Sequence, residues 1–319
     1  MQTRHWLQRP WVWWLFLLPV LLFSLSMGSV SLSLDQLFKP DTITYGIVWH
    51  LRLPRALNAI LVGGSLALAG LLIQNMVKNP LADPYLLGVS GGAASCQLLV
   101  IMLGLTVSQA ALFFIGFGGS LLATLLVLKL SYHGRIKPNK VTLNGVVMAF
   151  GFAAVISFML SLADGQQIRS MMFWLMGDLS FAQPSWLMGV LLIFCYVLLQ
   201  RQHSALDLLA RGELFARKSG VHAERLNLMV FLMTALLTSM AVAQAGTIGF
   251  VGLIIPHIVR LLVGYQHRHL LPISILAGAL FLLIADTLAR TLLSPVQLPV
   301  GIFTALIGVP VFLVLSRKI

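Results

Sequence analysis

The stretch PRALNAILVGGSLALAGLLIQN, residues 54–75, decides the fold class. After Arg55 it carries no charged residue, and its length matches the roughly 20 residues that a helix needs to cross a bilayer. The rest of the chain is similar, because 59% of its 319 residues are hydrophobic and only 9% are charged. A soluble domain carries about 25% charged residues, and a disordered chain lacks this much apolar surface. We therefore predict a membrane protein with several spans.

Outward from this segment, nine further apolar runs can each form a span. They are residues 11–27, 88–105, 110–130, 141–162, 185–200, 227–246, 253–265, 271–290 and 301–316. Ten spans of about 20 residues leave only short connections, so no stretch remains for a separate soluble domain. We expect an all-α integral membrane protein whose single transmembrane domain covers residues 1–319. The short runs 88–105 and 253–265 favour tilted helices or re-entrant backbone that lines a cavity.

The charges are distributed unevenly between the two sides of such a bundle. Ten spans place both termini on one side, where 16 of the 21 Lys and Arg residues but only four of the nine acidic residues fall. The net charge of +12 therefore belongs wholly to the side of the termini. Cytoplasmic loops carry this kind of basic excess, which predicts that both termini are cytoplasmic. Nucleic-acid binding, the other explanation of a basic chain, loses its support.

Motifs of enzymes and of ATP-driven motors are missing from the sequence. It has no G-x-x-x-x-G-K-[ST] loop, no H-E-x-x-H and no G-x-S-x-G. We expect no catalytic residue, no metal site and no cofactor bound by this chain, and a membrane enzyme is unsupported. His267 and His269 fall in a basic cytoplasmic turn, which we expect to be solvated. An ion-coupled secondary carrier stays open, although no lone acidic residue lies in the middle of a span.

Three segments carry charges that are unusual for their position. Arg52 and Arg55 lie on the outer side, where they either reach lipid phosphate or pair with acidic residues of a soluble partner. Asp286 and Arg290 have the i,i+4 spacing that lets two side chains pair on one helix face. The cytoplasmic stretch 201–226 predicts one or two short amphipathic helices, which either rest on anionic lipid or dock a cytoplasmic partner.

A stretch rich in Pro and Gly and a short internal repeat indicate broken helices. Residues 74–93 read QNMVKNPLADPYLLGVSGGA, in which prolines and glycines end a helix at its cytoplasmic end. The stretch is either a simple loop or a place where small residues allow close helix packing. ALAG at 67–70 is followed ten residues later by Pro80, and AQAG at 243–246 ten residues later by Pro256. The two copies run in opposite directions, which suits an inverted repeat, but the match is short enough to arise by chance.

Six motifs, in order along the chain, resemble the FecCD-type permease family. They are LRLPR at 51–55, ALAG at 67–70, NPLADP at 79–84, LGVS at 87–90, GFVGLIIPH at 249–257 and LPVG at 298–301. The resemblance covers residues 45–316, and the ordered combination is far more specific than any single motif. It implies a BtuC-like, type II ABC importer permease fold with ten transmembrane helices. It also implies an inverted relation between spans two to five and spans seven to ten.

The same resemblance implies partners and a substrate class. Members of the family are transmembrane permease subunits that pair as dimers in the bacterial cytoplasmic (inner) membrane. They bind two cytoplasmic ABC ATPase subunits, which use ATP and Mg, and they receive an extracytoplasmic substrate-binding protein. The expected substrate is a metal chelate, with ferric siderophore as first choice and haem or cobalamin as alternatives. Whether the second permease is an identical copy or a sister chain stays open.

Site residues follow from the positions that match the family's motifs. Binding-protein docking is expected at the outer arginines Arg52, Arg55 and Arg290, which match arginines that meet glutamates of the partner. ATPase coupling is expected, within the segment 201–226, at Leu209, Arg211, Gly212, Glu213, Arg217 and Gly220. A cytoplasmic gate is expected at Asn79, Leu81 and Asn139, although Pro138-Asn139 stands where the family often has small hydroxyl residues.

Overall fold

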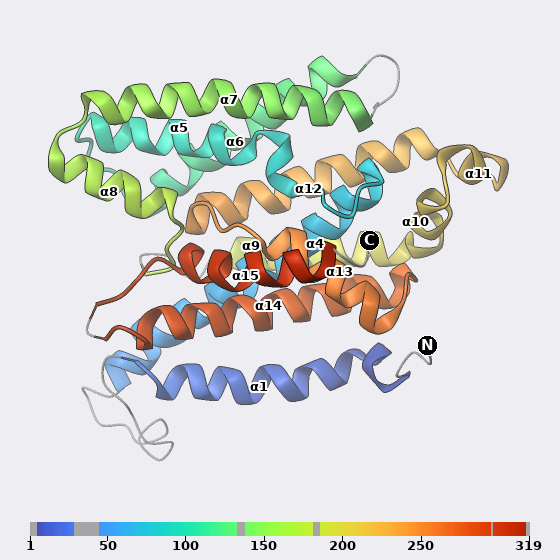
Figure 1. Ribbon diagram of the computed structural model, residues 1–319, viewed down its shortest axis with the longest axis horizontal. Coiled ribbons are helices and arrows are strands. Elements are labelled where there is room, and N and C mark those ends of the chain that lie inside the picture. Colours follow the sequence, from blue (N-terminus) through green and yellow to red (C-terminus); the bar gives the residue numbers. More distant parts are fainter. Residues whose placement is uncertain (1–4, 29–44, 133–137, 181–185, 295, 317–319) are drawn as a thin grey trace.

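The structure, a computed structural model, describes residues 5–28, 45–132, 138–180, 186–294 and 296–316 (Figure 1). The regular elements in these ranges are helices. The α-helices are α1 (Pro10–Ser26), α4 (Leu53–Val77), α5 (Val89–Met102), α6 (Gln109–Ser131), α7 (Pro138–Leu162), α8 (Gly165–Leu175), α9 (Trp186–Arg201), α10 (His203–Ala210), α11 (Glu213–Lys218), α12 (Ala223–Ala245), α13 (Val251–Val263), α14 (His267–Thr291) and α15 (Val300–Ser316). Three short helices of other types are η1 (His5–Gln8), η2 (Ile47–Arg52) and η3 (Pro84–Leu87).

The ten apolar runs predicted from the sequence are all helical. Five helices are long and apolar enough to cross a membrane singly: Ile47–Val77, Gln109–Ser131, Asn139–Leu162, Ala223–Ala245 and His267–Thr291. The pair α9 and α10 passes the same test together but is bent by 70°. Four shorter apolar helices, α1, α5, α13 and α15, complete the set. The all-α membrane fold is confirmed, and the helices expected within residues 201–226 are present as α10 and α11.

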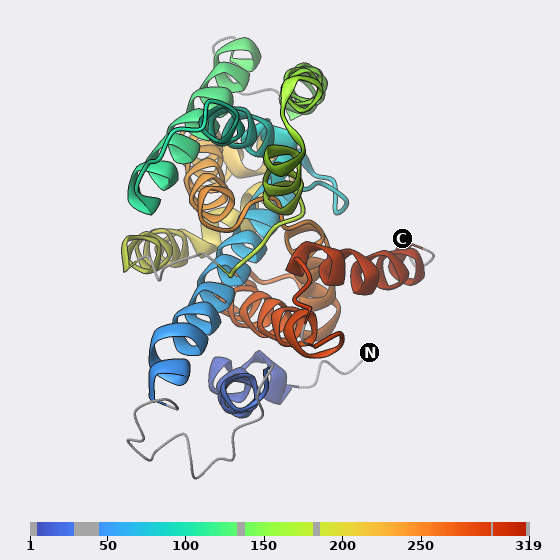
Figure 2. The ribbon, with the colours of Figure 1, turned by 90° about the vertical axis from the view of Figure 1, so that its left-hand side faces the viewer.

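Helix α4, which contains the opening stretch of the sequence analysis, runs through the centre of the bundle. It is buried along most of its length and crosses the molecule diagonally between α14 and α12 (Figure 2). Small residues let the neighbouring helices approach it closely. A Cβ added at Gly63 would overlap the backbone of Gly278 in α14, and one added at Gly70 would overlap that of Gly252 in α13. The segment that identifies the fold is therefore also its core.

Two helix breaks meet inside the bundle. Helix α4 ends at Lys78, which has a left-handed φ of +54°, and the short helix α5 follows after η3. Helix α12 ends at Gly246, and the short helix α13 follows after Phe250 at a φ of +70°. The breaks touch where Tyr85 Oη donates to Ile248 O and accepts from Ile248 N, each at 3.0 Å. The order of long helix, break and short helix thus occurs twice, which explains why the third and eighth apolar runs are short.

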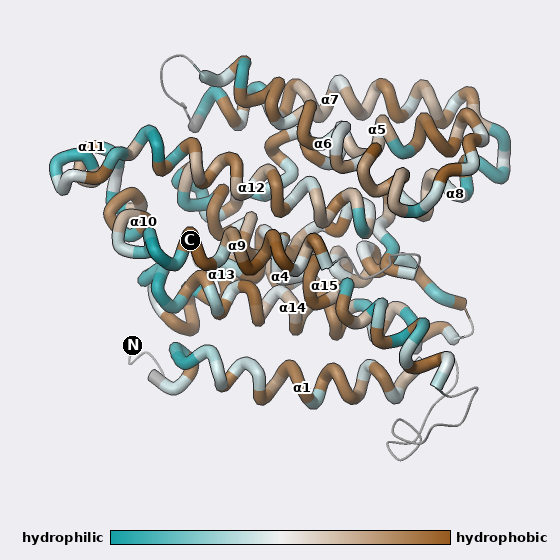
Figure 3. Tube along the Cα trace, turned by 180° about the vertical axis from the view of Figure 1, so that it is seen from behind, coloured by the Kyte–Doolittle hydropathy of each residue, from teal (hydrophilic) through white to brown (hydrophobic). Residues whose placement is uncertain are grey.

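Hydrophilic residues gather at the two ends of the helices, and the flanks between them are hydrophobic (Figure 3). Such a band is what contact with lipid requires, because the bilayer core offers no hydrogen-bond partners. Helices α10 and α11 project at one end, which we call the coupling end. The start of α1 and the end of α15 lie toward the same end. An even number of spans produces this arrangement.

Candidate functional site

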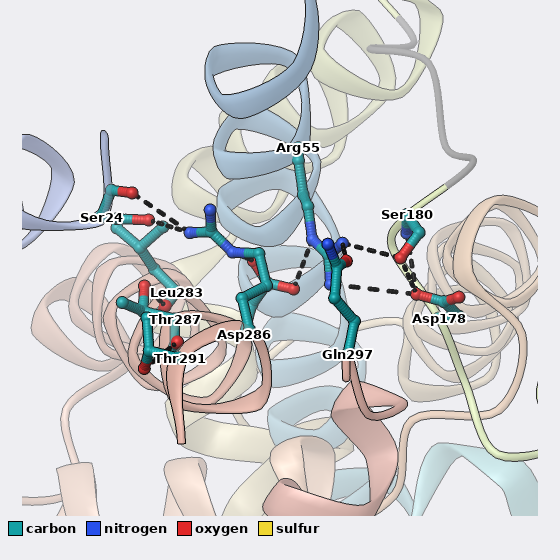
Figure 4. Close-up of polar contacts among 10 residues, drawn as sticks. Ser24, Arg55, Asp178, Ser180, Leu283, Asp286, Thr287, Thr291 and Gln297 are labelled. Carbon is teal, nitrogen blue, oxygen red and sulfur yellow. Dashed lines mark hydrogen bonds and ion pairs between the residues drawn. The ribbon is translucent and has the colours of Figure 1, made fainter. Parts of the chain in front are cut away.

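Arg55 joins three parts of the chain at the end of the bundle opposite the coupling end, which we call the arginine end (Figure 4). Its Nε donates to Asp286 Oδ1 of α14 at 2.9 Å. Its Nη1 donates to Ser180 Oγ at 2.7 Å and to Gln297 Oε1 at 2.9 Å, in the α8–α9 and α14–α15 connections. Its Nη2 lies 3.9 Å from Asp178 Oδ1 and has no hydrogen-bond partner among the described residues. One guanidinium group therefore links α4 to α14 and to two connections.

Asp286 is completely buried between two arginines. Its Oδ2 lies 3.1 Å from Arg290 Nε, which confirms the i,i+4 pair expected from the sequence. Arg290 Nη2 also donates to Ser24 Oγ of α1 at 2.8 Å and to Ser24 O at 3.2 Å. Burial of a carboxylate costs solvation free energy, and the contacts with two guanidinium groups offset that cost. Asp286 thus has two positive partners inside the protein, and the three side chains together keep a net charge of +1.

Arg52 caps the last turn of α1. Its Nη1 donates to Leu25 O at 2.7 Å and to Ser26 O at 2.9 Å, carbonyls that have no partner within the helix. The three arginines expected to dock a soluble protein are only 5% (Arg52), 7% (Arg55) and 5% (Arg290) exposed. The structure therefore brings all three to the arginine end, and each has partners within this chain. That they dock a soluble protein stays a prediction.

The coupling residues lie on α10, on α11 and on the turns beside them. Leu209 is buried in the bundle. Glu213 Oε1 accepts a hydrogen bond from Asn227 Nδ2 of α12 at 2.8 Å, which ties α11 to a long helix. Gly212 and Gly220 flank α11 with φ of +131° and +82°, a region that favours glycine because it has no Cβ. These residues fix how α11 is attached rather than what it presents to solvent.

The exposed face of α11 carries other side chains. Leu214 and Phe215 are 70% and 45% exposed, and sequence reasoning did not place them in the site. Arg211 lies over the Phe215 ring at 5.9 Å, and Arg217 pairs with Glu224 at 3.0 Å on the surface. The sequence signal that could have identified Leu214 and Phe215 is a pair of adjacent apolar residues in a basic loop. They form an apolar tip with positive charge around it.

A second link, which the sequence did not reveal, joins α10 to α14. Asp207 Oδ1 accepts from the backbone N of His267 at 2.9 Å and lies 2.7 Å from His267 Nδ1. Burial raises the pKa of Asp207, but the hydrogen bonds and the positive charge of His267 outweigh burial, so the pKa lies below its ordinary value. The expectation of a solvated turn is wrong for His267, which is 4% exposed. It is buried because it meets a carboxylate from a distant part of the chain.

The gate residues come from two places. Asn79 Oδ1 accepts a hydrogen bond from Leu81 N at 2.9 Å, and both residues are exposed in the turn after α4. Asn139 is exposed in the first turn of α7. One turn earlier in α4, Gln74 Nε2 donates to Leu253 O at 3.0 Å, a contact that sequence reasoning missed. This contact ties the end of α4, next to the gate turn, to α13.

A cavity of about 1500 Å³ lies beside the Arg55 contacts. Its wall includes Asp178, Ser180 and Gln297, the three residues held by Arg55 in the two connections. The remaining wall mixes aromatic and amide side chains with small and aliphatic ones, from α5, α6, α8, α9 and the end of α12, and it includes Arg169. In the described part of the chain, no three His, Cys, Asp or Glu side chains come together as metal ligands would. The wall can contact a large solute through ring faces and amide groups.

Helix α8, which forms one wall of this cavity, was not expected from the apolar runs. It begins at a capping box, in which Gln167 N donates to Asp164 Oδ1 at 2.8 Å and Asp164 N donates to Gln167 Oε1 at 3.3 Å. The pattern Asp-x-x-Gln before an amphipathic stretch is the signal that could have located it. A search for membrane spans does not detect an amphipathic helix of 11 residues, because such a helix contains no apolar run of about 20 residues.

Comparison with known proteins extends over nearly the whole chain. The model of the FecCD transport family matches residues 15–318. The hemin transport system permease protein HmuU of Yersinia pestis is 39% identical over 310 residues, which are 94% of this chain and 92% of that protein. The vitamin B12 import system permease protein BtuC of Klebsiella pneumoniae is 39% identical over 270 residues, 83% of this chain and 81% of its own.

Solved structures agree with this relationship. An ABC transporter described as of metal-chelate type, in an inward-facing conformation, matches with a TM-score of 0.85 and 33% identity over 97% of this chain and 99% of that chain. PsaBC from Streptococcus pneumoniae, in complex with Fab, matches with a TM-score of 0.59 and 18% identity over 86% and 93%, which supports the fold alone. The chain therefore belongs to the FecCD transport family, as a multi-pass membrane permease.

Proposed function

We propose that this chain is the transmembrane permease subunit of a binding-protein-dependent ABC importer that carries a metal chelate across the cytoplasmic membrane. The observation that carries the proposal is the α10–α11 pair, which projects from a polar end of the bundle and is bonded to α12 and α14. Relatives named for hemin and for vitamin B12 support the chelate class. Haem and cobalamin are therefore as well supported as ferric siderophore, the first choice that the family resemblance implied.

In this proposal an ATPase subunit binds the apolar tip of α11 from the cytoplasm. Leu214 and Phe215 supply apolar contact, and Arg211 and Arg217 surround them with positive charge. An apolar centre with a polar rim is the usual anatomy of a protein interface. ATP and Mg belong to the partner, and this chain acts as a non-catalytic subunit.

Closure of the ATPases reaches the bundle through two contacts. The Glu213–Asn227 hydrogen bond transmits displacement of α11 to α12, and the Asp207–His267 contact transmits displacement of α10 to α14. Both long helices pack on α4 at the centre. The ATP-dependent event therefore shifts an equilibrium between two arrangements of the same helices.

At the opposite end, the substrate-binding protein docks on Arg52, Arg55 and Arg290. The arginine end then faces outward, and both termini face the cytoplasm. Carboxylates of the docked protein pair with these guanidinium groups, which suits Arg because its planar fork binds carboxylates with two hydrogen bonds. The cavity beside Arg55 lies where a substrate would be delivered.

A second permease subunit completes the path, in contact with α7. This helix buries little of its surface in one chain and exposes large apolar side chains along its length, namely Leu143, Val147, Phe150, Phe158 and Leu162. In a bilayer, such side chains face lipid or another subunit. We favour the subunit because the gate residue Asn139 begins the same helix. Whether that subunit is an identical copy or a sister chain is left to experiment.

A self-sufficient ion-coupled carrier is the alternative from another class. Such carriers depend on an ionisable side chain that can bind and release the ion inside the bundle. Among the described residues, Asp286 is the buried acid, and two arginines already neutralise it. The geometry therefore favours the importer.

Uptake of labelled ferric siderophores, haem and cobalamin in cells with and without this chain tests the proposal. We expect loss of one chelate, and uptake that persists when an ionophore collapses the ion gradients but stops when ATP is depleted. Collapse with the gradient alone, at unchanged ATP, overturns the importer in favour of the carrier. Absence of any ATPase from the purified active transporter also overturns it.

A further inference from the structure

The docking function proposed above does not explain why Asp286 is buried between two arginines. It is 0% exposed, so a soluble partner does not reach it. Its two oxygens nevertheless face different arginines: Oδ1 accepts a hydrogen bond from Arg55 Nε at 2.9 Å, and Oδ2 forms an ion pair with Arg290 Nε at 3.1 Å without a hydrogen bond in the described part of the chain. In Figure 4 the Asp286 carboxylate faces the side chain of Arg55. One buried group therefore sets the spacing of two positive charges that come from different helices.

Arg55 divides its donors between this buried partner and the two connections. Nε is directed at Asp286, whereas Nη1 and Nη2 are directed at Ser180, Gln297 and Asp178. The 3.9 Å between Nη2 and Asp178 Oδ1 is longer than the roughly 2.7–2.9 Å of a charge-assisted hydrogen bond. Within the described residues Nη2 is buried and makes no hydrogen bond, which is a costly state for a guanidinium donor. A carboxylate that reached Nη2 would remove this cost.

On the basis of the docking function proposed above, we propose that Asp286 is a positioning residue for Arg55 and Arg290. Before docking, the place that the partner's carboxylate takes beside Arg55 is occupied by Asp178, Ser180 and Gln297. On docking, a partner carboxylate takes Nη1 and Nη2 of Arg55, while Nε stays on Asp286. The contacts of Arg55 with Asp178, Ser180 and Gln297 are given up in exchange.

The exchange has a consequence for the cavity. Asp178 and Ser180 belong to the α8–α9 connection and Gln297 to the α14–α15 connection, and all three line the cavity wall. Arg55 is the side chain that ties both connections to α4, beside the backbone hydrogen bonds from Asp178 N to Ala245 O and from Leu298 N to Ala289 O. Docking therefore loosens the cavity wall at the moment when the partner delivers its substrate. We call the contacts of Arg55 with Asp178, Ser180 and Gln297 the clasp, and docking of the correct partner releases them.

Two isosteric variants with opposite expected effects test the assignment. Asp286→Asn removes the charge that holds both arginines, so the affinity for the substrate-binding protein should fall about tenfold or more. Asp178→Asn removes the charge that competes with the partner's carboxylate for Arg55. The asparagine keeps a side-chain oxygen that can accept the hydrogen bond from Ser180 N, which is 2.8 Å long in the unaltered protein. Its affinity should rise about two- to fivefold.

Surface plasmon resonance on the complete transporter in nanodiscs measures these affinities. The probe is the purified substrate-binding protein whose deletion abolishes uptake of the identified chelate. Asp164→Asn is the matched control, because the side chain of Asp164 belongs to the capping box of α8. Its affinity should stay unchanged. Equal weakening by both test variants, or no change in either, overturns the proposal.

Hydrogen exchange of the full chain in nanodiscs gives a readout that needs no partner. Asp286→Asn should speed exchange in residues 176–180 and 296–299, although both segments are remote from residue 286 in the sequence. Arg55→Lys, which keeps the charge but loses the planar fork, should give the same pattern if helix content is retained. Faster exchange confined to α14 overturns the link. If uptake requires no binding protein, the proposed function fails, while this measurement still tests the clasp.

Discussion

The two ends of the bundle use their charged residues in opposite ways. At the arginine end, Arg55, Asp286 and Arg290 are at most 7% exposed, and Asp286 contacts both arginines. At the coupling end, the Arg217–Glu224 pair lies on the surface, with side chains 43% and 57% exposed. Buried ion pairs are expensive to break, whereas exposed ones are screened by water. The ion pairs of the arginine end therefore fix the positions of its side chains, whereas the surface pair of the coupling end adds little to stability.

Removal of one acidic side chain at each end should give the largest difference in the free energy of unfolding. Asp286→Ala leaves two buried arginines without their shared carboxylate, and we expect a loss of about 3–5 kcal/mol in the free energy of unfolding. Glu224→Ala removes an exposed partner and should cost about 1 kcal/mol or less. Denaturation of the detergent-solubilised chain measures both values. Similar costs for the two variants would remove the distinction between the ends.

The apolar tip of α11 should matter for assembly and hardly for folding. Leu214→Asp with Phe215→Asp places charge at the centre of the expected ATPase interface, so that ATPase affinity should fall by about 30-fold or more. Stability should change by about 0.5 kcal/mol, since both side chains are exposed. Leu209→Ala is the contrasting control, because it empties a buried position and should cost about 2–5 kcal/mol. Normal ATPase binding by the double variant would contradict the assignment.

The link between α11 and α12 should affect coupling more than assembly. Asn227→Leu removes the donor to Glu213 Oε1, a net loss of about 1 kcal/mol. We expect the ATPase to remain bound while transport per ATP hydrolysed falls severalfold. Proteoliposomes that report uptake and hydrolysis together give this ratio. Release of the ATPase instead would show that the contact serves docking.

The link between α10 and α14 should give the smallest effect, one that disappears in acid. The pKa of Asp207 is held below its ordinary value of 3.8, so its contribution to stability is present above that value and is lost as the pH falls through the lower folded-state pKa. Asp207→Asn should cost about 1 kcal/mol or less at pH 7. Unfolding profiles of the two proteins should converge below about pH 4. A difference that grows in acid would contradict this sign.

Local patterns predicted much of the fold. All ten apolar helices were located because a run of about 20 apolar residues is a property of consecutive positions. The Asp286–Arg290 pair was found for a similar reason, since i,i+4 spacing on a helix is local. Helix α8 was missed because its amphipathic 11 residues contain no such run. The family resemblance predicted that the three arginines share one end of the bundle. It did not indicate which residues of this chain they contact.

The sequence by itself determined a membrane permease with ten apolar helices, the family to which it belongs and the loop that carries α10 and α11. Tertiary structure decided which charges are buried and with whom. Arg55 and Asp286 are 231 positions apart, and Asp207 and His267 are 60 apart, so no local pattern encodes either contact. The physical reason is that hydropathy adds up along the chain, whereas the free energy of a charge depends on the water and the partners around it in space.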